Sequence, residues 1–186
     1  MEHFFQNFND WFNYHDFYKK VVESASSPSH FVEIGTYKGA SAAGMAVEII
    51  NSNKKITFDT YDIFDKDVAT NNMTHGMNDD AEEEARKNLL PVKDFVNIFK
   101  LSSIEASKKY KDESLDFVFI DGSHIYEDIL EDINHWYPKV KKGGILSGHD
   151  LNKNAPQVEQ AVTLFCELNN QSFYKESSMC WRIDKK

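Results

Sequence analysis

The sequence FVEIGTYKGAS, residues 31–41, joins a short apolar run to a segment with helical spacing. Downstream, apolar side chains from Ala42 to Ile49 recur at the three- and four-residue intervals of one helix face. Between the two parts, Gly35 and Gly39 let the backbone turn sharply and approach a ligand closely. The pattern predicts a strand, a tight turn and a helix, which is the opening unit of a parallel α/β sheet.

Apolar runs and amphipathic stretches keep alternating toward the C-terminus. The predicted parallel strands cover residues 30–34, 55–61, 95–101, 115–120 and 145–149. Two further runs, 172–176 and 179–183, predict an antiparallel hairpin at the sheet edge. The chain is therefore predicted to be a single doubly wound, Rossmann-like α/β domain over residues 1–186, with a mostly parallel seven-stranded sheet and helices on both faces.

Two segments lie outside this alternation. Residues 1–27 are rich in aromatic side chains, which favours one or two helices packed on the sheet, with a substrate lid or a dimer arm as the alternative. Residues 63–90 are acidic and include a predicted helix at 80–90. This insertion directly follows a strand end, so a lid and a surface loop both remain open.

Composition limits the classes of function. A length of 186 residues suits one domain, and a formal charge of −9 argues against nonspecific nucleic-acid binding. No apolar run reaches the roughly 20 residues that span a bilayer, and the start of the chain lacks the features of a signal peptide. We therefore expect a cytoplasmic protein with a small-molecule partner, either a monomer or a homo-oligomer. Cys166 and Cys180 are expected to be buried and reduced.

Acidic residues end successive predicted strands. In open α/β sheets, ligands bind outside the carboxyl ends of the strands, which is where Asp62, Asp121 and Asp150 are expected. The first turn lacks the G-x-G-x-x-G pattern that places a pyrophosphate on a helix N-terminus, and Glu33 stands beside it. An acidic turn suits a sulfonium ligand better than a dinucleotide, so a nucleotide- or NAD-binding module is the second hypothesis.

Several segments together resemble a known family. They are VEIGTYKGAS, DTYD, LSSIEA, the long block FIDGSHIYEDILEDINHWYPKVKKGGILSGHD, and PQVEQAVTLF, and they cover most of residues 31–168. The chain resembles class I S-adenosylmethionine-dependent methyltransferases. More narrowly, it is similar to the group that includes the metal-dependent macrolide-sugar O-methyltransferases.

The resemblance implies S-adenosylmethionine as the cofactor and assigns residues to it. Those around the first turn would flank the methionine portion, Asp62 would hold the ribose, and two serines would contact the adenine side, although a helix-capping role for the serines is the alternative. The expected cofactor-binding residues are Glu33, Gly35, Thr36, Tyr37, Gly39, Ser41, Asp62, Ser102, Ser103 and Asp121.

The resemblance also implies O-methylation of a small hydroxyl-bearing acceptor such as a sugar. His124, as the general base, and Asp121 would be the catalytic residues, and Asp121, Asp150 and His149 would hold a metal ion. His149 departs from the acidic residue that magnesium-binding relatives carry, so Mg²⁺, another divalent cation and no metal all stay open. The remaining alternatives are a capping role for His124 and a non-catalytic relative with the same fold.

Overall fold

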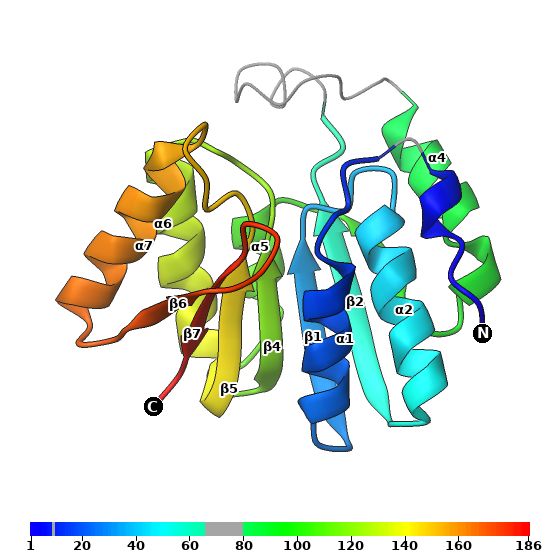
Figure 1. Cartoon of the computed structure of the whole chain (residues 1–186), viewed down its shortest axis with the longest axis horizontal. Helices are drawn as coiled ribbons and strands as arrows, with labels where there is room; N and C mark the ends of the chain where they lie inside the picture. The colour runs from blue at the N-terminus through cyan, green and yellow to red at the C-terminus, as the bar shows by residue number, and fades with distance from the viewer. Residues whose placement is uncertain (9, 66–79) are drawn as a thin grey trace.

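The structure is a computed structural model that describes residues 1–8, 10–65 and 80–186. Within these ranges, seven strands form one sheet in the order β3-β2-β1-β4-β5-β7-β6 (Figure 1). Strands β1 to β5 pair in parallel, and β7 runs antiparallel to both β5 and β6. The predicted α/β fold, with its parallel sheet and antiparallel edge hairpin, is confirmed.

The strands have the following bounds: β1 Ser29–Ile34, β2 Ile56–Asp62, β3 Asn97–Lys100, β4 Leu115–Ile120, β5 Val140–Gly148, β6 Phe173–Lys175 and β7 Trp181–Asp184. The α-helices are α1 His15–Ser24, α2 Ala40–Ser52, α4 Ala81–Asn88, α5 Ser103–Ser107, α6 Tyr126–Trp136 and α7 Pro156–Leu168. Short 3₁₀ turns are η1 Phe5–Asn7, η2 Leu90–Val92 and η3 Tyr137–Lys139.

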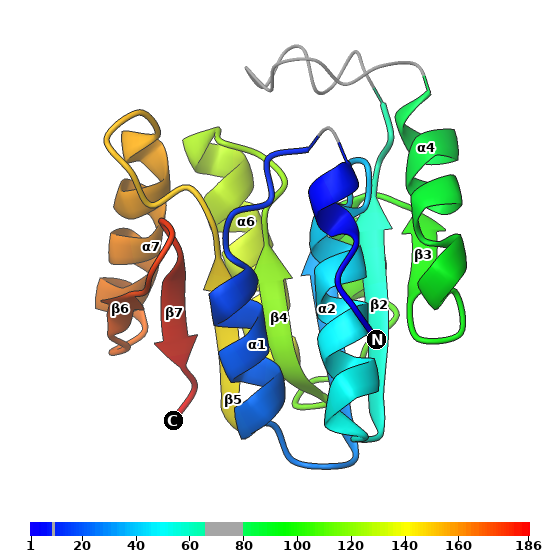
Figure 2. The same cartoon turned by 45° about the vertical axis from the view of Figure 1, so that its right-hand side comes forward.

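Helices cover both faces of the sheet. Figures 1 and 2 show α1 and α2 side by side on one face, with α5, α6 and α7 behind the other. Alternation along the strands supplies both layers, because successive side chains point to opposite faces. In β4, for example, Phe117 and Phe119 pack toward α1 and α2, whereas Val118 and Ile120 join the core beneath α6 and α7.

The fifth parallel strand begins earlier than predicted. β5 starts at Val140 instead of Ile145 and includes Gly143 and Gly144, a glycine pair of a kind that is typical of turns. A β-carbon at Gly144 would lie 2.9 Å from the backbone oxygen of Asp116, so the glycine allows close strand contact. The pairing of β4 with β5 shifts register at this place, as expected for a local irregularity in the ladder.

The structure describes helices in both of the segments that lie outside the alternation of strands and helices. Residues 15–24 form α1 and pack on α2, as the helical interpretation predicts. The predicted helix at 80–90 is present as α4. Residues 66–79, which include His75 and the body of the proposed lid, lie outside the described residues.

Further sequence-based expectations concern the cysteines and the membrane. Cys166 and Cys180 are buried free thiols, as predicted. In the part of the chain that the structure describes, no helix combines the length and apolar character needed to cross a bilayer.

Candidate active site

A cavity of about 780 Å³ opens at the carboxyl ends of the parallel strands. Its walls come from the turns after β1, β2, β3, β4 and β5, together with residues 10–14 ahead of α1. This is the place where doubly wound sheets bind ligands, on either side of the point where strand order reverses at β1 and β4. The predicted residues that line it are Gly35, Thr36, Tyr37, Ser41, Asp62, Ser102, Ser103, Asp121, His124, His149 and Asp150.

Gly35 brings the first turn against the end of β4. Its φ is +100°, and an added β-carbon would lie 2.0 Å from the backbone oxygen of Asp121. Its amide donates to the Tyr61 carbonyl at 2.8 Å, which joins the turn to β2 as well. Only glycine fits this conformation and this close approach together. The turn therefore lies between Asp62, at the end of β2, and Asp121, at the end of β4, and both acids line the cavity.

The Asp62 carboxylate stabilises the same turn by accepting hydrogen bonds from backbone amides. Its Oδ2 accepts from the amides of Thr36 and Tyr37 at 2.9 and 2.8 Å, and its Oδ1 accepts from the amide of Phe64 at 2.7 Å. Burial raises the pKa of Asp62, and these hydrogen bonds oppose the rise. Each carboxylate oxygen has two lone pairs, so Oδ1 keeps capacity for a ligand hydroxyl while Oδ2 is fully used.

Glu33 and Gly39 do not line the cavity. The Glu33 side chain is fully buried and accepts hydrogen bonds from Tyr18 Oη and Thr60 Oγ1, each at 2.7 Å. Burial raises its pKa to about 7. The Glu33 carboxylate is thus held by hydroxyl groups of α1 and β2, and Gly39 lies beside Leu89. The cofactor contacts expected of both residues stay predictions.

Three candidate metal ligands converge at the ends of β4 and β5. His149 Nδ1 lies 3.7 Å from Asp121 Oδ1 and 3.4 Å from Asp150 Oδ1, and the three ligand atoms lie within 4.8 Å of one another. Burial raises the pKa of Asp121. For Asp150 burial acts in the same direction, but the hydrogen bonds from two histidines outweigh it and hold the pKa well below its usual range.

His124 forms a tight pair with Asp150. Its Nε2 lies 2.6 Å from Asp150 Oδ2. This hydrogen bond raises the pKa of His124, and burial opposes the effect. A histidine held by a carboxylate through one ring nitrogen presents the other nitrogen as an acceptor, which is the arrangement of a general base.

The segment ahead of α1 supplies site residues that the sequence did not reveal. Tyr14 Oη donates to Asp121 Oδ2 at 2.7 Å, and Asn13 Oδ1 lies 3.1 Å from His149 Nε2. Trp11, also on the cavity wall, stacks on Tyr37 with ring centroids 5.0 Å apart. These contacts join residues more than 25 positions apart, so no local sequence pattern predicts them.

The far end of the cavity is built by the start of α5 and by α6. Ser102 caps α5: its hydroxyl accepts from the Glu105 amide at 3.4 Å and donates to the Glu105 carboxylate at 2.7 Å. Ser103 hydrogen-bonds the buried carboxylate of Asp132, whose pKa burial raises to about 7. The capping interpretation of Ser102 is thus confirmed, and both serines also face the cavity.

Acidic side chains outnumber basic ones among the described residues that line the cavity, where His124 and His149 are the basic groups. No lysine or arginine is present among the described residues that line it. The lining carboxylates are Asp10, Asp62, Asp121, Asp128, Glu131, Asp132 and Asp150. Low-dielectric walls focus such a field, so the cavity favours a ligand with a positive centre and opposes a pyrophosphate.

The larger part of the chain matches a known protein family. Residues 32–151 match the family model described as a methyltransferase domain. A curated relative, the uncharacterized protein y4gI of Sinorhizobium fredii, is 26% identical over 162 residues, which are 80% of this chain. The chain spans only 16% of the length of that relative.

Solved structures share the fold at low identity. The O-methyltransferase NovP has a TM-score of 0.69 and 18% identity, covering 92% of this chain and 79% of its own. A putative caffeoyl-CoA O-methyltransferase from Staphylococcus aureus has a TM-score of 0.68 and 15% identity, covering 96% and 87%. A putative methyltransferase from Streptococcus mutans, solved in complex with SAH, has a TM-score of 0.62 and 14% identity, covering 92% and 95%. The chain belongs to the methyltransferase domain family, and its sheet has the class I architecture of S-adenosylmethionine-dependent methyltransferases.

Proposed function

We propose that this protein transfers a methyl group from S-adenosylmethionine to a hydroxyl oxygen of a small acceptor. The observation that carries the proposal is the acidic cavity at the strand ends, in which seven carboxyl side chains and no described lysine or arginine surround the space for a sulfonium. A volume of about 780 Å³ lies in the upper part of the roughly 300–1,000 Å³ range of small-molecule sites, which suits a cofactor together with a small acceptor.

The turn after β1 and the end of β2 are the proposed cofactor cradle. Gly35 presents bare backbone to the cavity, and Asp62 Oδ1 retains a lone pair for a ribose hydroxyl. Ser103 and the raised-pKa carboxyl of Asp132 offer polar groups at the opposite end for a purine base. When bound, S-adenosylmethionine supplies a methyl group made electrophilic by the sulfonium charge.

His124 is the proposed general base. Its Nε2–H donates to Asp150, which leaves the lone pair of Nδ1 free to take the acceptor's hydroxyl proton. As that oxygen forms its bond to the methyl carbon, the bond from carbon to sulfur breaks and its electron pair stays on sulfur. The negative charge of Asp150 stabilises the imidazolium that results, consistent with the raised pKa of His124.

Asp121, His149 and Asp150 are the proposed ligands of a divalent cation. Two carboxylates and one imidazole fit Mn²⁺ or Zn²⁺ better than Mg²⁺, which prefers oxygen ligands alone. When bound there, a cation supplies charge that lowers the pKa of an acceptor hydroxyl. Tyr14 fixes the Asp121 carboxylate by donating to Oδ2, so that Oδ1 faces His149.

Calorimetry with S-adenosylmethionine, S-adenosylhomocysteine and NAD tests the cofactor assignment without knowledge of the acceptor. We expect binding of the first two and none of NAD; binding of NAD alone would overturn the proposal. Release of S-adenosylhomocysteine is then measured with sugars and other hydroxyl compounds, with and without Mn²⁺. Cofactor binding without turnover on any hydroxyl acceptor, alongside turnover on an amine, would overturn the O-methylation assignment alone.

A further inference from the structure

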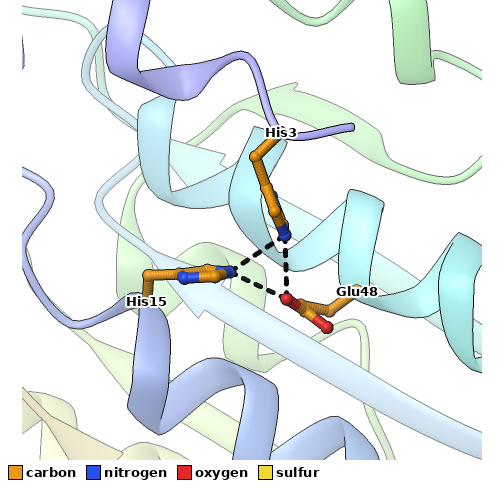
Figure 3. Close-up of side chains that lie close together, drawn as sticks. All are labelled: His3, His15 and Glu48. Atoms are coloured by element: carbon orange, nitrogen blue, oxygen red, sulfur yellow. Dashed lines mark hydrogen bonds and ion pairs between the residues drawn. The ribbon is translucent and has the colours of Figure 1, made fainter. Parts of the chain in front are cut away.

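Two histidines and a glutamate meet on the outer side of the α1 and α2 layer, away from the active-site cavity. Figure 3 shows the side chains of His3, His15 and Glu48 pointing toward one another. His3 precedes η1, His15 is the first residue of α1, and Glu48 belongs to α2. Sequence analysis assigned none of them a role, and none lines the cavity at the strand ends.

The three facing atoms form a compact triangle. Glu48 Oε1 lies 2.9 Å from His3 Nε2 and 2.8 Å from His15 Nε2, and the two Nε2 atoms are 3.1 Å apart. Each Nε2 can carry one hydrogen, so protons can satisfy at most two of these three contacts. If both hydrogens point at Glu48, two N–H groups face each other across the third side. A cation at the centre would instead satisfy all three lone pairs together.

The dimensions and chemistry suit zinc. A tetrahedral zinc ion holds nitrogen and oxygen ligands at about 2.0–2.1 Å, which separates them from one another by about 3.3 Å. The observed separations of 2.8–3.1 Å reach that value with movements of a few tenths of an ångström. Two histidines and one glutamate are a known zinc ligand set that leaves the fourth position to water.

The three side chains are partly buried. They are 20%, 26% and 10% exposed for His3, His15 and Glu48, so an ion can reach them while most of their surface is shielded from solvent.

We propose that His3, His15 and Glu48 bind one divalent transition-metal ion, Zn²⁺ by ligand preference, in a site separate from the Asp121, His149 and Asp150 cluster. The ion would join the start of the chain to α1 and α2. Residues 10–14, which lie between His3 and His15 in the chain, form one wall of the active-site cavity. Metal binding would thus fix that wall from outside.

The test compares variants of the untagged, chelator-treated full chain. Zinc is titrated calorimetrically into wild type, His3→Gln/His15→Gln, Glu48→Gln and Asp150→Asn, with His135→Gln as control because His135 contacts only a helix carbonyl among the described hydrogen bonds. Glu48→Gln keeps an acceptor oxygen for the histidines, so it separates metal loss from loss of folding. We expect the double variant and Glu48→Gln each to lose one equivalent of zinc per chain, and Asp150→Asn to keep it.

Anchoring of the N-terminal segment is measured independently by hydrogen exchange. Zinc should slow exchange in residues 1–14 of wild type and Asp150→Asn, and leave the double variant unchanged. A weakening of more than about 100-fold is expected for Glu48→Gln, since substitutions that act only through a ligand's hydrogen-bond partner cost about 10–100-fold. Equal zinc stoichiometry in wild type and the double variant, with both folded by circular dichroism, would overturn the proposal.

Discussion

Substitution of Gly35 by alanine should destabilise the fold and abolish cofactor binding together. The added methyl would lie 2.0 Å from the backbone oxygen of Asp121, and residues with a side chain rarely adopt the backbone φ of +100° found here. Left-handed strain costs about 1–2 kcal/mol. Overpacking against a backbone atom, which cannot swing away as a flexible side chain can, adds about 1–3 kcal/mol. The expected loss is therefore about 2–5 kcal/mol in the free energy of unfolding.

Thermal and urea unfolding measure this loss. A domain of 150–250 residues loses about 2–4 °C in Tm per kcal/mol, so we expect a fall of roughly 4–20 °C. Gly122→Ala is the matched control on the adjacent turn, because its methyl would lie 3.7 Å from Ile34 Cγ2, an ordinary contact. Calorimetry with S-adenosylmethionine should then show binding lost in Gly35→Ala and kept in Gly122→Ala.

Equal stability of the two alanine variants would refute the reasoning about the close approach of β1 and β4. A destabilised Gly35→Ala that still binds the cofactor normally would refute the placement of the cradle at this turn, while leaving the packing argument intact. The two measurements therefore test separate steps.

Other predictions concern protons and metal. His124→Gln should lower kcat by about 10²–10⁴-fold and remove the rise of activity with pH, whereas His135→Gln should do neither. In the wild type this rise lies above pH 6.5, because the aspartate partner raises the pKa of His124. A rise of activity with pH that persists in His124→Gln would contradict the base assignment. Tyr14→Phe removes a hydrogen bond to Asp121 worth about 1.5–3 kcal/mol, so calorimetry should show Mn²⁺ affinity reduced about tenfold or more at pH 7; unchanged affinity would exclude a positioning role for Tyr14. Burial raises the pKa of Asp132 to about 7 in the folded protein. The stability that this carboxyl contributes is therefore full below about pH 4, where the unfolded chain is protonated too, and is lost as pH rises to 7. In urea unfolding, wild type should lose stability relative to Asp132→Asn over this range, and a constant difference between the two would contradict the shift.

Elements with a continuous or strictly periodic apolar pattern were predictable from sequence. β4 has the bounds expected, Leu115–Ile120, because Phe117–Ile120 form the continuous apolar run of a strand that is buried on both faces. The acids that end β2, β4 and β5 face one cavity because parallel strands carry their carboxyl ends to the same edge. Adjacency of β4 and β5 then places Asp121 near Asp150.

The start of β5 could not be predicted from local pattern. Gly143 and Gly144 are typical of a turn, and only the approach of Asp116 from the neighbouring strand explains why a glycine belongs inside this one. The burial of Glu33 could not be predicted for a related reason: its neighbours in sequence are strand residues, whereas its hydroxyl partners come from α1 and β2. Contacts with residues distant in sequence determine both the start of β5 and the burial of Glu33.

Tyrosines of α1 reach two of the acids that the parallel strands present. Tyr18 holds Glu33 and Tyr14 holds Asp121, each through a hydrogen bond of 2.7 Å. The family match begins at residue 32, downstream of both tyrosines, and ends at 151, before β7 pairs with β5. A protein cut at those limits would keep the carboxylates and lose the phenols that restrain them, so gene fragments for transplanting this catalytic unit need to begin ahead of Tyr14 and run through the final strand.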